Sequence, residues 1–183
     1  MRSFLLSLLL VFTADLLFPL NAHATSVATL TDSQLVQFSD AIAHVTILSA
    51  EPFRFDENTI LTRVTAQVRE CLKSCDDTET IVFYTRGGRL DDTTQVFPGE
   101  FKAAEGSEVV VFLEKIGRYE DRLMVLGLEQ GAFRIVPVPM SRMDMKYPRT
   151  AVRHFRVPGS SFDASPDLRS LKDAIRLEME HSR

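Results

Sequence analysis

The two cysteines of the chain, Cys71 and Cys75, are the residues whose spacing most directly predicts chemistry. If the three residues between them form a turn, their α-carbons can lie within the ~4.4–6.8 Å that a disulfide spans. A redox-active pair is one alternative, but that chemistry typically uses two intervening residues beside a helix N-terminus. Metal binding by the two cysteines is the other alternative. We therefore predict a structural disulfide that locks a turn.

Residue types that bind metals do not fall into known patterns. No His-x-x-x-His or Cys-His spacing occurs around His44, His154 or His181, so no zinc site is predicted. We expect His44 to be a strand residue with a local partner. The acidic pairs at residues 76–77 and 91–92 lack the frame of a calcium loop and are interpreted as solvated turns. No metal and no cofactor are expected.

Two short motifs resemble catalytic or phosphate-binding loops without their context. Ser160 and Ser161 follow a glycine but lack the Gly-x-Ser-x-Gly frame of a hydrolase nucleophile. Gly87 and Gly88 lack the following Lys-Ser of a phosphate-binding loop. A protein without enzymatic activity is therefore expected. The alternative is an exported enzyme, either a thiol–disulfide protein or a hydrolase whose site assembles from distant residues.

A local excess of positive charge occurs in the last third of the chain, although the whole chain has a formal net charge of −4. Such a segment could bind a lipid headgroup, a cell-wall polymer or an acidic protein. The alternative is an extended segment whose cations pair with acidic residues of the domain. The acidic chain as a whole does not favour nucleic acid as a partner. The basic residues of the segment are Arg142, Lys146, Arg149, Arg153 and Arg156.

Residues 1–24 have the pattern of a secretory signal peptide. Arg2 precedes an apolar run over residues 4–12, and residues 22–24 (Ala-His-Ala) form a small-x-small cleavage pattern. The run is shorter than the ~18 residues of a spanning helix. We therefore expect export to the periplasm or the medium, no membrane span after cleavage, and one domain over residues 25–183.

The clearest β-structure lies in residues 59–88, where polar and apolar residues alternate. The even positions from Thr62 to Val68 are expected to face a core. Residues 80–85 then form the returning strand, which ends at Gly87 and Gly88, where the backbone needs positive φ or close approach.

Four further segments complete a predicted barrel of about six strands over residues 41–136. Residues 41–49 are rich in β-branched side chains, and the apolar run 108–114 fits a strand buried on both faces. Residues 123–128 and 132–136 are expected to pair as a hairpin. The absence of a strand–helix–strand pattern favours a mainly β, antiparallel architecture.

Two irregular regions are expected within this barrel. Pro52 interrupts strand pairing, so residues 50–58 are predicted as a turn region. Residues 90–106 contain a proline, a glycine and two adjacent aspartates and are predicted as a long loop. Long ordered loops commonly carry binding sites, which makes this loop a candidate.

Two helices are predicted outside the barrel. Residues 31–40 begin with a capping residue and place Leu35, Val36 and Phe38 near one face. After an irregular, basic stretch over residues 137–164, Ser165 is expected to cap a C-terminal helix over about residues 166–180. The apolar residues expected to dock this helix on the barrel are Leu168, Leu171, Ala174, Ile175 and Met179.

Several short motifs follow one another over residues 35–136. They are Asp40-Ala41, the ECLKS run over residues 70–74, Gly87-Gly88, Phe101, the GSEVVVFL run over residues 106–113, and Gly131-x-Phe133. Together they resemble a group of small exported bacterial proteins of unknown function, OB-fold barrels of the netrin-module or metalloproteinase-inhibitor kind. The resemblance implies an OB-like barrel.

Two departures limit what this resemblance implies. A glycine usual in the first strand is replaced around Val45, and cysteines flank the turn at Leu72-Lys73-Ser74. Netrin-like inhibitors chelate a metal through an N-terminal cysteine, whereas the expected mature N-terminus here is Thr25. We therefore expect a non-enzymatic exported module that presents the 90–106 loop and the basic segment to an unknown protein or polymer of the envelope or extracellular space. A structural part of an envelope assembly is a further possibility.

Overall fold

The computed structural model of the chain describes residues 28–75, 79–137, 149–152, 157, 159–165 and 167–182. Within these residues the protein is mainly β-structure, as the sequence predicts, with two α-helices. None of the helices in this part of the chain is long and apolar enough to cross a membrane. The predicted signal peptide lies outside the described residues, and its cleavage stays a prediction.

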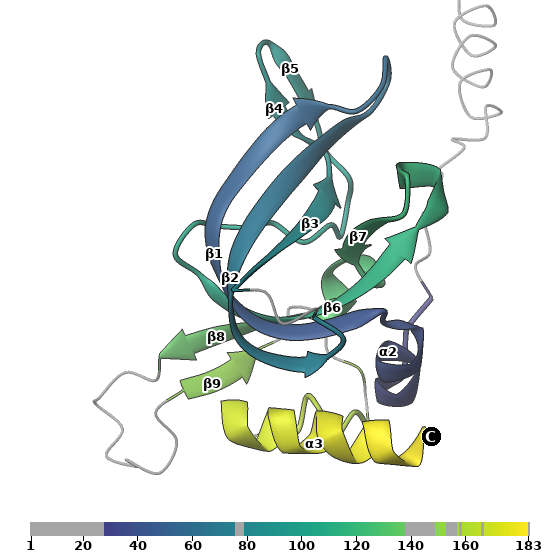
Figure 1. Cartoon of the computed structure of the whole chain (residues 1–183), viewed down its shortest axis with the longest axis vertical. Helices are drawn as coiled ribbons and strands as arrows, with labels where there is room; N and C mark the ends of the chain where they lie inside the picture. Colours follow the sequence, from purple (N-terminus) through teal and green to yellow (C-terminus); the bar gives the residue numbers. More distant parts are fainter. Residues whose placement is uncertain are drawn as a thin grey trace, which may run out of the picture.

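Seven of the described strands form one hydrogen-bonded sheet in the order β1-β2-β3-β7-β6-β8-β9 (Figure 1). Because β1 also pairs with β6, the pairings of the first five strands in this order return to their starting point. The strands are β1 (Ala41–Arg54), β2 (Ile60–Lys73), β3 (Thr80–Arg86), β6 (Glu108–Ile116), β7 (Arg122–Val125), β8 (Ala132–Pro137) and β9 (Arg149–Val152).

One pairing in this ring of five strands is parallel. Tyr84 of β3 and Met124 of β7 are its partners, whereas the other pairings of the sheet are antiparallel. Five strands whose pairings close on themselves cannot alternate in direction throughout, so one parallel contact is unavoidable. The sheet is therefore mixed, and the expectation of a wholly antiparallel arrangement is wrong.

β1 is longer than the sequence predicts and is strongly curved (Figure 1). Pro52 pairs with Thr62 of β2, so the turn predicted over residues 50–58 begins only after Arg54. β6 pairs with β1 only over Ala41 to Thr46, so Pro52 lies on an edge where its missing N–H costs no sheet hydrogen bond. Three register shifts in the first half of β1 account for its curvature.

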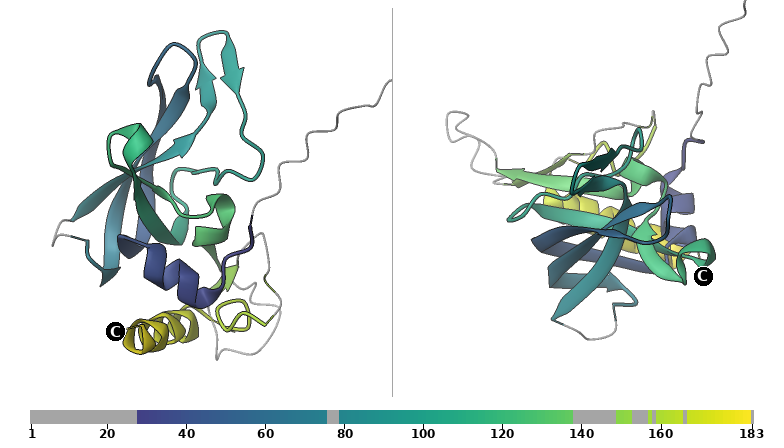
Figure 2. Two further views of the ribbon diagram at one scale, coloured as in Figure 1. Left: turned by 90° about the vertical axis from the view of Figure 1, so that its right-hand side faces the viewer. Right: turned by 90° about the horizontal axis from the view of Figure 1, so that it is seen from above.

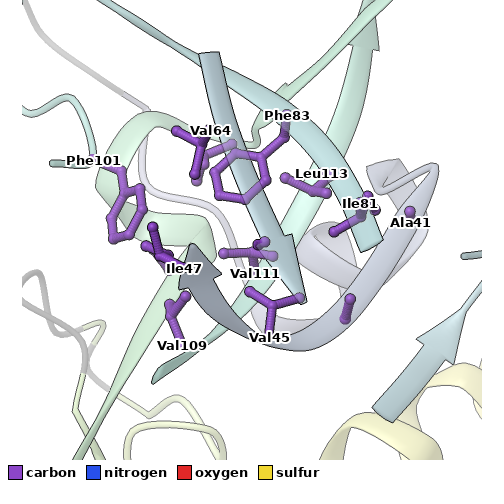
Figure 3. Close-up of a cluster of buried hydrophobic side chains, with 14 of the residues drawn as sticks. Ala41, Val45, Ile47, Val64, Ile81, Phe83, Phe101, Val109, Val111 and Leu113 are labelled. Carbon is purple, nitrogen blue, oxygen red and sulfur yellow. The ribbon is translucent and has the colours of Figure 1, made fainter. Parts of the chain in front are cut away.

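The first core cluster collects side chains from β1, β2, β3 and β6 (Figure 3). As predicted, the even positions of β2 face it, since Val64 and Ala66 are buried and Val68 packs against it. Thr62 is only half buried. The alternation in the sequence therefore identified the inner face of this strand correctly.

β6 is buried on both faces, as its continuous apolar run predicts. Val109, Val111 and Leu113 belong to the first core cluster, whereas Val110 and Phe112 belong to a second one. Because successive side chains of a strand point to opposite faces, this single strand contributes to two cores.

The second core cluster is covered by α2 (Asp32–Phe38) and α3 (Leu168–His181), which lie at one end of the molecule (Figures 1 and 2). The predicted apolar stripe of α3 packs here. Leu171 and Ile175 are fully buried, and Leu168, Ala174 and Met179 are partly buried against the cluster. The expected docking of this helix is confirmed.

The start of α3 differs from the prediction. Asp167 is its N-cap and accepts a hydrogen bond from the Ser170 amide at 2.8 Å. The Ser165 hydroxyl instead donates to the carbonyl of Ser161 at 3.0 Å. A carboxylate two residues further along therefore takes the capping role, and Ser165 belongs to the preceding turn.

α2 begins as predicted, because Thr31 and Gln34 form a reciprocal capping box. Leu35 and Val36 are buried in the second core cluster. Phe38 is 50% exposed, so its predicted place on the buried face is wrong. It is the last residue of the helix, next to an extended Ser39.

The two strands after β6 do not form the predicted hairpin. β7 pairs with Leu113 to Ile116 of β6, whereas β8 pairs with Val109 to Val111 of the same strand. The 3₁₀ turn η3 (Leu128–Gly131) separates them, so they lie end to end along β6. β8 pairs instead with β9, which shows that part of the segment predicted to be irregular is a strand.

Candidate functional site

The predicted disulfide between Cys71 and Cys75 is present, with 5.7 Å between the α-carbons. Cys71 lies in β2 opposite Ala43 of β1, and Cys75 is buried in the first core cluster. The last β2–β3 pair is Gln67 with Thr80, so the disulfide lies beyond that ladder. It holds the end of the β1–β2 pairing and the chain that leaves it.

The basic segment cannot be assembled into a site from the described residues. Arg142, Lys146, Arg153 and Arg156 lie outside them, and only the backbone of Arg149 is described, in β9. Binding of an anionic partner by this segment stays a prediction.

The predicted long loop over residues 90–106 is more ordered than expected. It contains strand β5 (Thr93–Gln95), which pairs with β4 (Gly88–Leu90) to form a separate two-stranded sheet. This hairpin lies at the end of β1 and β2 remote from the helices (Figures 1 and 2). A candidate site lies beneath it, at the end of β3.

This site, the Arg86–Glu100 hollow, has a volume of about 290 Å³. It lies between the end of β3, the β4–β5 hairpin and the chain over residues 96–103. Its side chains combine three cations with one acid, several hydroxyls and a few apolar groups. The lining residues are Thr62, Thr85, Arg86, Gly87, Gly88, Arg89, Thr94, Gln95, Val96, Phe97, Glu100, Phe101, Lys102 and Ala103.

An ion pair forms one wall of this hollow. The Nε of Arg86 donates to Oε2 of Glu100 at 2.8 Å, and the Arg86 guanidinium lies over the ring of Phe97. The Glu100 side chain is only 4% exposed, whereas that of Arg86 is 27% exposed. Among the described residues, Oε1 of Glu100 has no hydrogen-bond partner. A buried oxygen of this kind is unusual in folded proteins.

Burial determines the protonation of the acids near Arg86. It raises the pKa of Glu100 above the ordinary value, and the opposing effect of the Arg86 charge is smaller. The pKa of Glu114 in β6 is also raised, mainly by burial and against the charge of Arg86. Glu100 is therefore a carboxyl group that takes up a proton more readily than an exposed one.

Two glycines allow the hairpin to fold back over the hollow. Gly87 and Gly88 both have positive φ. A Cβ on Gly87 would lie 2.4 Å from the carbonyl oxygen of Gln95, and one on Gly88 would lie 2.7 Å from Oγ1 of Thr62. The same Thr62 hydroxyl donates to the Gly87 carbonyl, while Gln95 accepts from the Ile60 amide. These contacts fix the hairpin against β2, as the predicted close approach requires.

The opposite wall is fixed by Phe101 and Arg134. Phe101 is buried in the first core cluster and lies beside Ile47 in Figure 3. The Arg134 guanidinium lies over the Phe101 ring and donates to the carbonyl of Lys102 at 2.8 Å. Glu100 also lines a neighbouring hollow of about 380 Å³, which shares Val96, Phe97 and Lys102 with this one.

A second buried charge cluster, the His44 cluster, lies under α3 and is different in character. Oε1 of Glu108 lies 2.6 Å from Nε2 of His44, and the Lys172 ammonium lies 3.0 Å from Nδ1. Lys172 also pairs with Glu70, which pairs in turn with Arg176. His44 is thus a strand residue with local partners, as predicted.

The tautomer of His44 follows from its neighbours. An ammonium group can only donate, so Nδ1 accepts from Lys172 and Nε2 carries the proton that Glu108 accepts. Burial first, and the Lys172 charge second, lower the pKa of His44 below 6.5. The neutral His44 ring therefore links β1 to β6 and α3. The residues of the His44 cluster do not line the Arg86–Glu100 hollow.

The described residues contain no group of three or more His, Cys, Asp or Glu side chains that could hold a metal ion. Sequence reasoning missed the pair Arg86 and Glu100. The available signal was Glu100 itself, a single acid in the run Val-Phe-Pro-Gly-Glu-Phe over residues 96–101. An acid surrounded by apolar residues is a candidate for burial with a partner.

No protein-family model matches the chain, and the curated proteins contain no significant match to it. The likeness to netrin-like OB-fold proteins therefore stays a prediction from the motifs.

Proposed function

We propose that this protein is an exported, non-enzymatic binding module built on an OB-like barrel, and that the Arg86–Glu100 hollow is its ligand-binding site. The cyclic pairing order β1-β2-β3-β7-β6 supports the barrel, because an OB-fold is a five-stranded Greek-key barrel. The disulfide between Cys71 and Cys75 supports export, since such bonds persist in oxidising compartments.

The observation that carries this proposal is the unpartnered Oε1 of Glu100. Leaving a buried polar atom without a hydrogen bond costs about 1–3 kcal/mol, and more if it is charged. A hydrogen-bond donor that a ligand brings to this atom would satisfy it. The neighbouring Arg86 and the exposed Val96 provide further contacts for a ligand.

A fragment screen followed by ¹H–¹⁵N NMR tests the site. Fragments that bind are expected to shift the amide signals of Arg86, Gly87, Phe97 and Lys102. Arg86→Gln should weaken binding, whereas Arg63→Gln, which changes an exposed arginine of β2, should not. Binding that shifts only signals outside this hollow, or that survives Arg86→Gln unchanged, would refute the proposed site.

Export is tested separately by analysis of the protein recovered from its own cells. The expected product begins at Thr25, contains no free thiol and occurs in the periplasm or the medium. Protein that retains residues 1–24 in the cytoplasm would contradict this part of the proposal.

A further inference from the structure

The Arg86–Glu100 hollow is positively charged, although the whole chain carries a formal net charge of −4. Arg86, Arg89 and Lys102 line it, and Glu100 is the only acid among the described residues of its lining. A concave site lined by one sign of charge attracts ligands of the opposite sign. The lining therefore favours an anionic ligand over a cationic one.

The guanidinium of Arg86 is arranged to receive such an anion. Its Nε is engaged by Glu100, and its two terminal nitrogens make no hydrogen bond to any described residue. These nitrogens form the planar fork that binds carboxylate, phosphate or sulfonate groups in a bidentate manner. Phe97 supports the guanidinium from below, which limits its freedom before the ligand binds.

Glu100 would oppose an anion if it stayed ionised, because the anion on Arg86 would lie close to a second negative charge. A protonated Glu100 removes this repulsion and donates a hydrogen bond from Oε1 to the ligand. Burial already raises the pKa of this carboxyl, so the protonated form is accessible. An anion bound to Arg86 would raise it further by offsetting the charge that opposes protonation.

We propose that the Arg86–Glu100 hollow binds an oxyanion attached to an apolar group, and that Glu100 takes up one proton from solvent when the ligand binds. The proposal rests on the proposed function and specifies its ligand. Arg86 binds the anion through its terminal nitrogens, protonated Glu100 donates to it, and Val96 and Phe97 contact the apolar group. Val96 is 68% exposed and is available for this contact.

Other charged groups surround this pair and set its response to pH. Arg89 of β4 and Lys102 also line the hollow, and a positive charge that lies close to a carboxyl group favours its ionised form. Glu114 of β6 interacts with Arg86, and Glu129 and Arg134 line the neighbouring hollow across Glu100. Of the charged groups in the part of the chain that the structure describes, only Glu100 combines near-complete burial with an unpartnered oxygen.

Isothermal titration calorimetry of the full chain with benzenesulfonate tests this inference. Benzenesulfonate does not titrate near neutral pH, so any proton uptake belongs to the protein. Its affinity should rise as the pH falls towards the raised pKa of Glu100 in the free protein, by up to about tenfold per pH unit. Buffers of different ionisation enthalpy should reveal proton uptake that approaches one per ligand.

Three variants assign the effect to its residues. Arg86→Gln should weaken binding by about tenfold or more, because a charge-assisted contact is lost. Glu100→Gln should retain binding and abolish both the pH dependence and the proton uptake. Arg63→Gln is the matched control and should behave as the wild type. The wild-type pH series tests the proposal by itself if a variant does not fold.

The outcomes that would contradict the oxyanion and proton-uptake proposal can be distinguished from a failure of the proposed function. Benzylamine that binds the hollow more tightly than benzenesulfonate would overturn the oxyanion but retain a ligand site. Affinity for benzenesulfonate that is independent of pH would overturn the proton uptake alone. Inorganic sulfate that binds as tightly would overturn the apolar contact. If no fragment shifts the signals of the hollow, both proposals fail.

Discussion

Two charge clusters among the described residues differ in whether their buried polar atoms have hydrogen-bond partners. In the His44 cluster, both ring nitrogens have partners, and the cluster joins the sheet to α3. In the Arg86–Glu100 pair, one carboxylate oxygen has no partner among the described residues and the pair lines a hollow. Satisfied networks specify structure, whereas an unsatisfied group beside a hollow marks a candidate for a binding site.

The two clusters should also respond to pH in opposite directions. Unfolding restores the ordinary pKa of both groups, which is 6.5 for His44 and 4.5 for Glu100. The pKa of His44 is lowered in the folded protein. Its contribution to the free energy of unfolding is therefore full above pH 6.5 and declines as the pH falls below that value. The pKa of Glu100 is raised in the folded protein. Its contribution to the free energy of unfolding is therefore full below pH 4.5 and declines as the pH rises through the folded pKa.

The largest effect is expected from breaking the closed cluster at its centre. Lys172→Met leaves Nδ1 of His44 without a donor and removes a charge partner of Glu70. We expect the free energy of unfolding in urea to fall by about 2–3 kcal/mol, less than for a fully buried pair because Glu70 is partly exposed. Lys115→Met, on an exposed side chain, should change it by less than about 0.5 kcal/mol. Equal effects of the two changes would contradict a structural role for the cluster.

A smaller effect is expected for the pH dependence of stability. His44→Gln should flatten the loss of unfolding free energy below pH 6.5, by at most about 1.4 kcal/mol per pH unit. The difference between the two proteins in the slope of unfolding free energy against pH isolates His44 from the other titratable groups. An identical slope in both proteins would mean that His44 does not titrate differently on folding.

The smallest effect is expected from neutralising the open cluster. Glu100→Gln removes the cost of ionising a buried carboxyl and retains an acceptor for Arg86, so stability at pH 8 should rise by about 0.5 kcal/mol. Glu108→Gln, the same change in the closed cluster, should lower stability by about 1 kcal/mol because it weakens a charge-assisted bond to His44. Chemical unfolding of both variants at one pH makes the comparison. A loss for Glu100→Gln as large as that for Glu108→Gln would show that both clusters are structural.

Local patterns predicted much of the fold. The alternation in β2 and the continuous apolar run of β6 are properties of neighbouring residues, and both strands formed as expected. The closing β3–β7 contact joins Tyr84 to Met124, and no local pattern encodes so distant a pairing. The same holds for β7 and β8, which pair with successive segments of β6 and so lie end to end instead of side by side.

The candidate site was less accessible to sequence reasoning. The loop over residues 90–106 was predicted as a candidate binding region, and β5, the Val96–Phe97 pair and residues 100–103 of it line the hollow. Its partner Arg86 ends a different strand, and only the fold brings the two within hydrogen-bond distance. The cysteine pair, by contrast, is separated by three residues, so spacing alone predicted its disulfide.

The most direct test of the distinction between the two clusters is the titration of the Glu100 carboxyl carbon, followed by ¹³C NMR with and without benzenesulfonate. We predict that Glu100 titrates above its ordinary value of 4.5 and that the ligand moves its midpoint further upward. A midpoint at or below 4.5 that the ligand does not change would contradict the account, because Glu100 would then be a structural ion-pair partner of Arg86.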